Sequence, residues 1–183
     1  RSYEQECTKY GIPYKVFGGF KFYKRREIKD ILAYLRLMSN PDDNEAMERI
    51  INVPKRGIGG KTVQTMYEYS QSLGFTLYDA VIDSDELPLS QGTKNKINAF
   101  AALIKDFVFL SLQLPVNELV RRIISVTNLR AEYDDGSDEG DGKLANLDEF
   151  IASVDDYVRL NPNSNLNDYL NQITLFSDTD EMD

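Results

Sequence analysis

The clearest candidates for chemistry in this chain are three glycines and a Gly-Lys-Thr triplet in the segment NVPKRGIGGKT, residues 52–62. A Gly-Lys-Thr triplet that opens a helix can hold the phosphates of a nucleotide, as it does in a P-loop. A P-loop also needs a glycine five residues before the glycine of the triplet, and Lys55 occupies that position. It must follow a buried strand, and Pro54 cannot donate to the hydrogen-bond ladder of one. The spacing therefore disfavours an ATP site.

A helix, a tight Gly-Ile-Gly turn and a second helix fit the same segment better. The glycines allow the backbone to turn sharply and to approach a ligand closely, and the isoleucine can enter the core and fix the turn. The free amide groups at the start of the second helix, near residues 60–62, would suit a phosphate. This pattern predicts contacts to the backbone of duplex DNA rather than to its bases; the alternative is a plain helix-helix turn with solvated lysines. The predicted contact residues are Lys55, Arg56, Gly57, Ile58, Gly59, Gly60, Lys61 and Thr62.

Two further segments have a chemical pattern. In GGFKFYKRREIKD, residues 18–30, aromatic and basic residues alternate. Such side chains can stack on single-stranded nucleic acid, but packing at a joint between domains is the favoured interpretation. The acidic segment 133–142 lacks the ligand order of an EF-hand, and we expect a solvated loop there.

No catalytic residue and no set of metal ligands emerges from the sequence. The chain has no histidine, which excludes Ser-His and Cys-His nucleophilic catalysis and any site with a histidine ligand. With Cys7 as the only cysteine, a structural zinc site and an internal disulfide are excluded as well. We find no signal-peptide pattern and no apolar run of membrane-spanning length, and therefore expect a cytoplasmic protein.

The charge of the chain is unevenly distributed. The net charge is −9, yet residues 1–66 carry 13 basic and 8 acidic residues, a net of +5. Residues 67–183 carry the remaining 8 basic and 22 acidic residues, a net of −14. An overall acidic protein is a poor generic nucleic-acid binder, but this asymmetry permits a basic face on an acidic molecule.

The elements that must position these residues are almost all helical. Apolar residues recur at helical spacing along most of the chain. One short strand is predicted at 12–17, after a helix that ends near Tyr10 and before Gly18 and Gly19. Asp42 or Asp43 and later Thr76 are expected N-caps. The predicted helices are 25–38, from 42 or 43 to 53, from 62 onward, 75–81, 93–112, 115–124, 144–157 and 166–176.

The fold class that follows is mainly α, a multi-helix accessory domain with a helix-hairpin-helix-like Gly-Ile-Gly turn. A short helix-strand remnant of an α/β domain precedes it. Residues 1–19 cannot fold alone, because a lone strand leaves its backbone groups unpaired. We therefore divide the chain into this remnant, a helical domain at 20–176 and an acidic tail at 177–183.

The segment from residue 11 to residue 62, which includes GIPYKVFGG and NVPKRGIGGKT, closely resembles the accessory 2B region of superfamily 1 DNA helicases of the UvrD/Rep/PcrA type. NLDEF at 146–150 and LFSDTDEMD at 175–183 resemble later family motifs, so the resemblance covers essentially the whole chain. It implies that residues 1–19 are the last piece of the RecA-like 2A domain and that the helical domain is the 2B subdomain. The Walker motifs are missing, so we expect this fragment alone to be non-catalytic and to need no cofactor, with ATP and Mg used by the parent helicase.

The resemblance also implies a function. In the family the 2B region contacts the duplex ahead of the fork, partly through the Gly-Ile-Gly turn, and swivels relative to the motor domains, which would make Gly18 and Gly19 a hinge. We expect a regulatory subdomain of an ATP-dependent 3′-5′ DNA helicase of repair or replication. Its partners would be double-stranded DNA at the fork, its own motor domains, and repair or replication proteins. One alternative is an autoinhibitory module that docks proteins instead of DNA; another is a nucleotide hydrolase, which would need nucleotide binding at residues 60–62.

Overall fold

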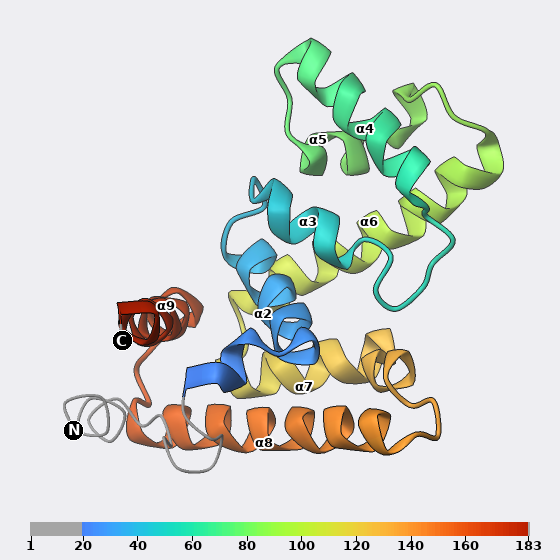
Figure 1. The fold of residues 1–183 in the computed structure, drawn as a ribbon. Coiled ribbons are helices and arrows are strands. Elements are labelled where there is room, and N and C mark those ends of the chain that lie inside the picture. The colour runs from blue at the N-terminus through green and yellow to red at the C-terminus, as the bar shows by residue number, and fades with distance from the viewer. Residues whose placement is uncertain (1–19, 183) are drawn as a thin grey trace.

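The computed structural model of the 183-residue chain describes the backbone of residues 20–182 and the side chains of residues 21–176. The predicted helix before Tyr10, the strand at 12–17 and the hinge glycines Gly18 and Gly19 lie outside the described residues. Within residues 20–182 the regular elements are all helical (Figure 1), which confirms the mainly α fold class. They are η2 (Phe20–Lys24), α2 (Arg26–Ser39), α3 (Asn44–Ile50), α4 (Gly60–Leu73), α5 (Leu77–Ile82), η3 (Ser84–Glu86), α6 (Gln91–Ser111), α7 (Val116–Thr127), η4 (Leu129–Glu132), α8 (Asp138–Leu160) and α9 (Leu166–Met182).

Several helices begin at side chains that cap their first amide groups. Asp43 accepts a hydrogen bond of 3.0 Å from the amide of Ala46 at the start of α3. Thr76 and Asp79 form a reciprocal capping box at the start of α5. These contacts satisfy amides that have no acceptor within the helix, and they confirm the predicted caps at Asp43 and Thr76.

The acidic segment 133–142 is only partly a loop, which corrects the prediction. Helix α8 begins at Asp138, because the hydroxyl of Ser137 accepts a hydrogen bond of 3.0 Å from the amide of Gly140. Asp138, Glu139 and Asp141 lie in the first turn. Negative charge is favourable there, since the amide end of a helix carries partial positive charge. The charges that suggested a solvated loop are therefore charges that suit a helix start.

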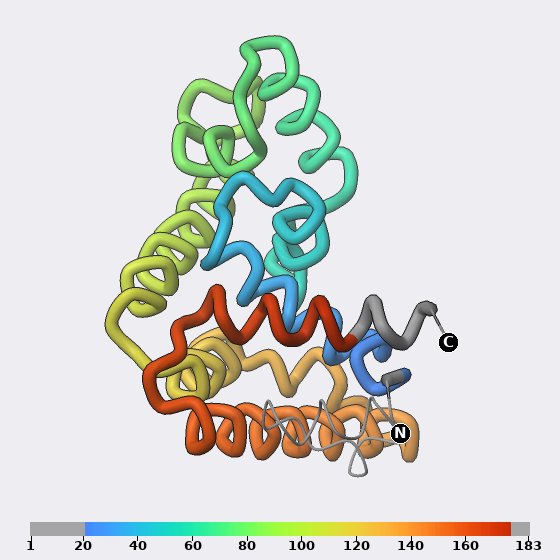
Figure 2. Tube along the Cα trace, turned by 90° about the vertical axis from the view of Figure 1, so that its left-hand side faces the viewer, coloured from blue at the N-terminus to red at the C-terminus, as the bar shows by residue number. Residues whose placement is uncertain are grey.

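Helix α2 occupies the centre of the molecule. Figures 1 and 2 both show α4 and α5 at one end, α7 and α8 at the other, and α2 and α3 between them. Helix α2 packs against α3, α6, α7, α8 and α9. The buried apolar side chains form one continuous cluster that includes Met66 of α4, Ile31 of α2 and Phe150 of α8.

A buried carboxylate ties three parts of this core together. Asp30 of α2 is 3% exposed and accepts hydrogen bonds from Arg49 Nε of α3 at 2.8 Å and from the Tyr133 hydroxyl at 2.5 Å. Burial, and then the bond to Asp30, raise the pKa of Tyr133, so its hydroxyl stays protonated and remains a donor. A buried charge needs such partners, and these fix the start of the α8 connection against α2 and α3.

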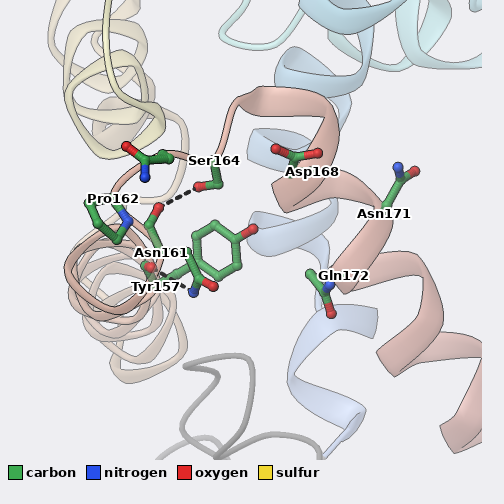
Figure 3. A pocket seen from close by; sticks show the side chains of 8 residues that line it. Tyr157, Asn161, Pro162, Ser164, Asp168, Asn171 and Gln172 are labelled. Carbon is green, nitrogen blue, oxygen red and sulfur yellow. Dashed lines mark hydrogen bonds between the residues drawn. The ribbon is translucent and has the colours of Figure 1, made fainter.

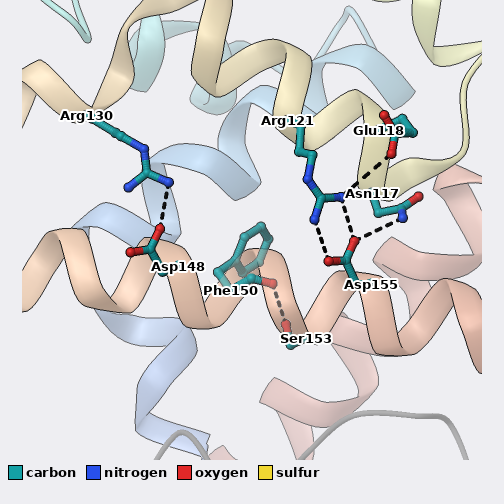
Figure 4. A network of polar contacts seen from close by, with 8 residues as sticks. All are labelled: Asn117, Glu118, Arg121, Arg130, Asp148, Phe150, Ser153 and Asp155. Carbon is teal, nitrogen blue, oxygen red and sulfur yellow. Dashed lines mark hydrogen bonds and ion pairs between the residues drawn. The ribbon is translucent and has the colours of Figure 1, made fainter.

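Helix α8 is joined by ion pairs to α7 and to η4 (Figure 4). Arg121 of α7 donates through both terminal nitrogens to the carboxylate of Asp155, at 2.6 and 2.5 Å, and Asn117 adds a third bond at 3.0 Å. The Arg121 bond holds the pKa of Asp155 below its usual value. Arg130 of η4, the short helix that follows α7, donates to Asp148 of α8 at 2.7 Å. The first ion pair holds α7 against α8, and the second holds η4 against α8.

Candidate nucleic-acid interface

The segment between α3 and α4, residues 51–59, contains the Gly-Ile-Gly sequence and is shaped by one amide side chain. Oδ1 of Asn52 accepts hydrogen bonds from the amide of Arg56 at 2.7 Å and from the amide of Ile58 at 3.2 Å. The side chain of Ile58 is 1% exposed and belongs to the core cluster. The hydrogen bonds of Asn52 and the buried side chain of Ile58 therefore stabilise the turn from its inner side.

Gly57 lies at the outer corner of this turn and has a φ of +77°. Only glycine adopts that region without a steric penalty from Cβ. A Cβ at this position would also lie 3.0 Å from Nζ and 3.2 Å from Cδ of Lys96. The backbone conformation favours glycine here, and the flexible Lys96 side chain would have to shift slightly to admit a larger residue. This gives a physical reason for the first glycine of the Gly-Ile-Gly sequence.

Arg56 points inward, although the sequence suggested that it contacts phosphate. Its Nη1 donates to the carbonyl oxygens of Ile50 at 2.6 Å and Ile51 at 3.2 Å. Its Nη2 donates to the hydroxyl of Tyr34, and its guanidinium carbon lies 4.8 Å from the centre of the Phe100 ring. The guanidinium thus caps the end of α3 from within and connects the turn to α2 and α6.

The Tyr34 hydroxyl completes this inner network. It donates to the carbonyl oxygen of Val53 at 2.5 Å while it accepts from Arg56. Burial raises the pKa of Tyr34, an effect that Arg56 opposes, so the hydroxyl remains protonated at neutral pH and can do both. The turn is consequently connected to α2 through Tyr34 and to α6 through Phe100.

The outer side of the turn is open. Lys55, Gly59, Gly60 and Lys61 are exposed, and Thr62 is half-buried. A Cβ built at Gly59 or Gly60 would meet nothing within 4 Å. Gly59 is the N-cap of α4 and has no side chain to cap it, and the first turn of α4 holds no acidic residue. The first amides of α4 therefore have neither an acceptor within the helix nor a capping side chain at Gly59.

The lysines around this opening have no acidic partner among the described residues. The ion pairs within residues 21–176 involve neither Lys55 nor Lys61. The structure therefore brings Lys55, Gly59, Gly60, Lys61 and Thr62 to one outer surface. It turns Arg56 and Ile58 to the inner side of the same turn.

Lys96 of α6 is a neighbour of this surface that the sequence did not indicate. Its side chain is exposed and lies against Gly57, as described above. It comes from a helix that begins more than thirty residues after the turn, so no local pattern links the two. Only the packing of α6 against the turn reveals the proximity.

Phe22 and Tyr23, the aromatic residues of the segment 18–30 whose side chains the structure describes, are packed within the helical domain. Phe22 is 0% exposed and Tyr23 is 5% exposed. Tyr23 lies edge-on to Phe22 and to Phe176 of α9, with ring centroids 5.3 and 5.4 Å apart. Rings committed to such contacts are not available to stack on nucleic-acid bases.

A hollow without basic residues lies elsewhere, at the turn between α8 and α9 (Figure 3). It measures about 490 Å³ and none of its lining residues is basic. Ser164 donates to the carbonyl oxygen of Asn161 at 2.8 Å, and Asp168 faces it from α9. Within the described part of the chain no group of three acidic, histidine or cysteine side chains could hold a metal ion. This hollow offers no counter-charge for phosphate.

The whole chain matches one protein family. Residues 1–183 fit the model of the UvrD-like helicase C-terminal domain, and the chain belongs to that family. It is 34% identical over 184 residues to the ATP-dependent DNA helicase PcrA of Bacillus subtilis strain 168. It is 35% identical over 186 residues to PcrA of Staphylococcus epidermidis strain ATCC 12228 and 33% identical over 186 residues to PcrA of Staphylococcus aureus strain COL. Each comparison covers 100% of this chain but only 25–26% of the relative, so the chain spans about a quarter of the length of these proteins.

None of the described helices is both long enough and apolar enough to cross a membrane.

Proposed function

We propose that this chain is the 2B subdomain of an ATP-dependent 3′-5′ DNA helicase of repair or replication, and that it holds duplex DNA by its phosphate backbone. The parent protein would hydrolyse ATP with Mg through motor domains that lie outside this chain. The helicase names of the PcrA relatives support the parent activity. The chain's own contribution would be positional, since it would grip and orient the duplex while the motor pulls on one strand.

One observation carries the proposal: the turn at residues 51–59 is braced from inside and open outside. The exposed lysines Lys55 and Lys61 flank Gly59 and Gly60, whose positions face open space. The first amides of a helix, which have no acceptor within the helix itself, suit a phosphate, as do nearby ammonium groups. Because Gly59 and Gly60 have no side chains, a sugar-phosphate strand could approach the backbone closely.

The proposal includes motion and partners. The 2B subdomain would swivel relative to the motor domains about Gly18 and Gly19. Repair or replication proteins of basic character would suit residues 67–183, where the net charge is −14.

Titration of a labelled DNA duplex with the 183-residue chain at several salt concentrations tests the proposal. We expect weak binding that falls as salt rises, because each neutralised phosphate releases a counterion. K55Q and K61Q should each lower the steepness of log K against log salt by about 0.9, the value for one phosphate contact on B-DNA. K105Q, on α6, is the control for loss of one positive charge. The proposal would be contradicted if the chain did not bind duplex at low salt. It would also be contradicted if the slopes of log K against log salt for K55Q and K61Q matched the slope for K105Q.

A further inference from the structure

A third lysine beside the glycine turn, Lys96, belongs to α6 and is distant from the turn in sequence. Lys96 is exposed on α6 and immediately precedes Ile97, which together with Phe100 anchors α6 in the core. Its Cδ and Nζ would lie 3.2 and 3.0 Å from a Cβ on Gly57, so the stem lies across the bare corner of the turn. Among the described residues no carboxylate forms an ion pair with Lys96.

Arg56, by contrast, has its charged group occupied within the protein. Its two terminal nitrogens bond to Ile50, Ile51 and Tyr34, and its plane lies over the Phe100 ring. Contact with a phosphate would require Arg56 to give up its bonds to the carbonyl oxygens of Ile50 and Ile51 and to the Tyr34 hydroxyl. A charge-assisted bond to a carbonyl is among the stronger hydrogen bonds of a protein, and a guanidinium over an aromatic ring adds further attraction.

We propose that Lys96, and not Arg56, is the third cation that this turn presents to a DNA phosphate, beside Lys55 and Lys61. Arg56 is a positioning residue that holds the turn from behind. The inference rests on the proposed function, because it specifies which side chains contact the DNA. It also assigns α6 to the DNA-binding surface, which otherwise consists of the turn and the start of α4.

The geometry gives Gly57 a second role in this arrangement. Because Gly57 has no side chain, the exposed Lys96 side chain can lie close against the corner of the turn. A lysine suits this position, since its charge sits on a flexible stem with three rotatable donors. Each ammonium that meets a phosphate should appear as one further counterion released.

The experiment is a salt titration of duplex binding by the 183-residue chain and five variants: K96Q, K105Q, R56Q, Y34F and K61Q. K96Q should lower the steepness of log K against log salt by about 0.9. Its affinity deficit should therefore shrink about threefold when salt rises from about 50 to about 200 mM. K105Q is the matched control: Lys105 is exposed on the same helix, and nine residues place it two and a half turns away, on the opposite face.

R56Q tests the positioning role. It should weaken binding by a similar factor at every salt concentration and leave the slope at the wild-type value, because no phosphate contact is removed. Y34F removes the hydroxyl that accepts from Arg56 without touching the outer surface, and should show the same parallel loss. Far-UV circular dichroism establishes that each variant is folded, and Y34F replaces R56Q in this comparison should R56Q unfold.

The outcomes separate this inference from the proposed function. If the wild-type chain binds and K61Q lowers the slope while K96Q matches K105Q, the assignment of Lys96 is wrong and the proposed function stands. If folded R56Q lowers the slope by about 0.9, Arg56 contacts phosphate and its positioning role is wrong. If the wild-type chain does not bind duplex at low salt, the proposed function itself fails.

Discussion

Single residues in the turn at 51–59 divide into those that hold it and those that it presents. Asn52 collects two backbone amides, and Arg56 returns to the end of α3. Lys55 and Lys61 stay outside. Residues adjacent in sequence therefore point to opposite sides of the turn. A substitution at Asn52 or Arg56 tests the shape of the turn, whereas a substitution at Lys55 or Lys61 tests the charge of its surface.

Gly57 and Gly60 should respond to alanine with opposite signs. G57A places a side chain at a φ of +77° and against Lys96, and should lower the free energy of unfolding by about 1–2 kcal/mol. G60A adds a methyl group in open space within the first turn of α4, and should raise it by about 0.4–1 kcal/mol through a less flexible unfolded chain.

Urea unfolding followed by far-UV circular dichroism measures both changes. Equal midpoints for the two variants would show that Gly57 is not constrained as described.

The residue types of the turn were predictable from sequence, but their directions were not. The Gly-Ile-Gly spacing indicated a sharp turn with a buried isoleucine, and Ile58 is buried. The sequence offered no means to separate Arg56 from Lys55, because the partners of Arg56 include Tyr34 and Phe100, which are distant in the chain. The approach of Lys96 depends on the same long-range packing.

Among the helices, α8 shows most clearly how an element is set by its start. Gly140 lies in the first turn, and a Cβ there would be 2.4 Å from Oδ1 of Asp135 and 2.5 Å from the carbonyl oxygen of Tyr133. Gly142 is in the same helix, and a Cβ there would meet nothing within 4 Å. The first glycine allows the preceding connection to pack against the helix; the second has no such role.

This pair provides a prediction at the scale of the element. G140A should lower the free energy of unfolding by about 1–3 kcal/mol, because a backbone oxygen must move to admit the methyl group. G142A should raise it by about 0.5–1 kcal/mol, since alanine is the better residue within a helix. Thermal unfolding of the two variants beside the wild type measures the difference. A G140A variant as stable as G142A would show that the start of α8 is not packed in this way.

Helix positions were largely predictable from the 3.6-residue period. The apolar residues at helical spacing in the predicted 93–112 helix include Ile97, Phe100, Ile104 and Phe107, which are buried in α6. They also include Leu112, which lies one residue past the end of α6 and is 80% exposed. The start of α8 was not predictable from the sequence, because glycine and aspartate are typical of loops. There the cap at Ser137 and the favourable field at a helix start outweigh composition.

At the scale of the whole molecule, the apolar core connects both ends. The cluster runs from Met66 and Val81 in α4 and α5, through Ile31 in α2, to Phe150 and Ile173 in α8 and α9. A continuous core of this kind links the stability of all its helices, so the described part of the chain should unfold as one cooperative unit.

Equilibrium unfolding in urea, observed by two probes, tests this cooperativity. Far-UV circular dichroism reports on helices, and tyrosine fluorescence is usable because the chain has 11 tyrosines and no tryptophan. We expect coincident transitions with one midpoint and one slope. Two separated transitions would show that α4 and α5 form an independent unit.

The inner network of the turn has a mechanical consequence. Arg56 ties the corner to the carbonyl end of α3, to Tyr34 of α2 and to the ring of Phe100 in α6. If a DNA strand bound at the turn were under tension, the contacts of Arg56 would transmit the force from the turn to those helices. The turn should therefore move together with α2, α3 and α6 and not as a flexible loop.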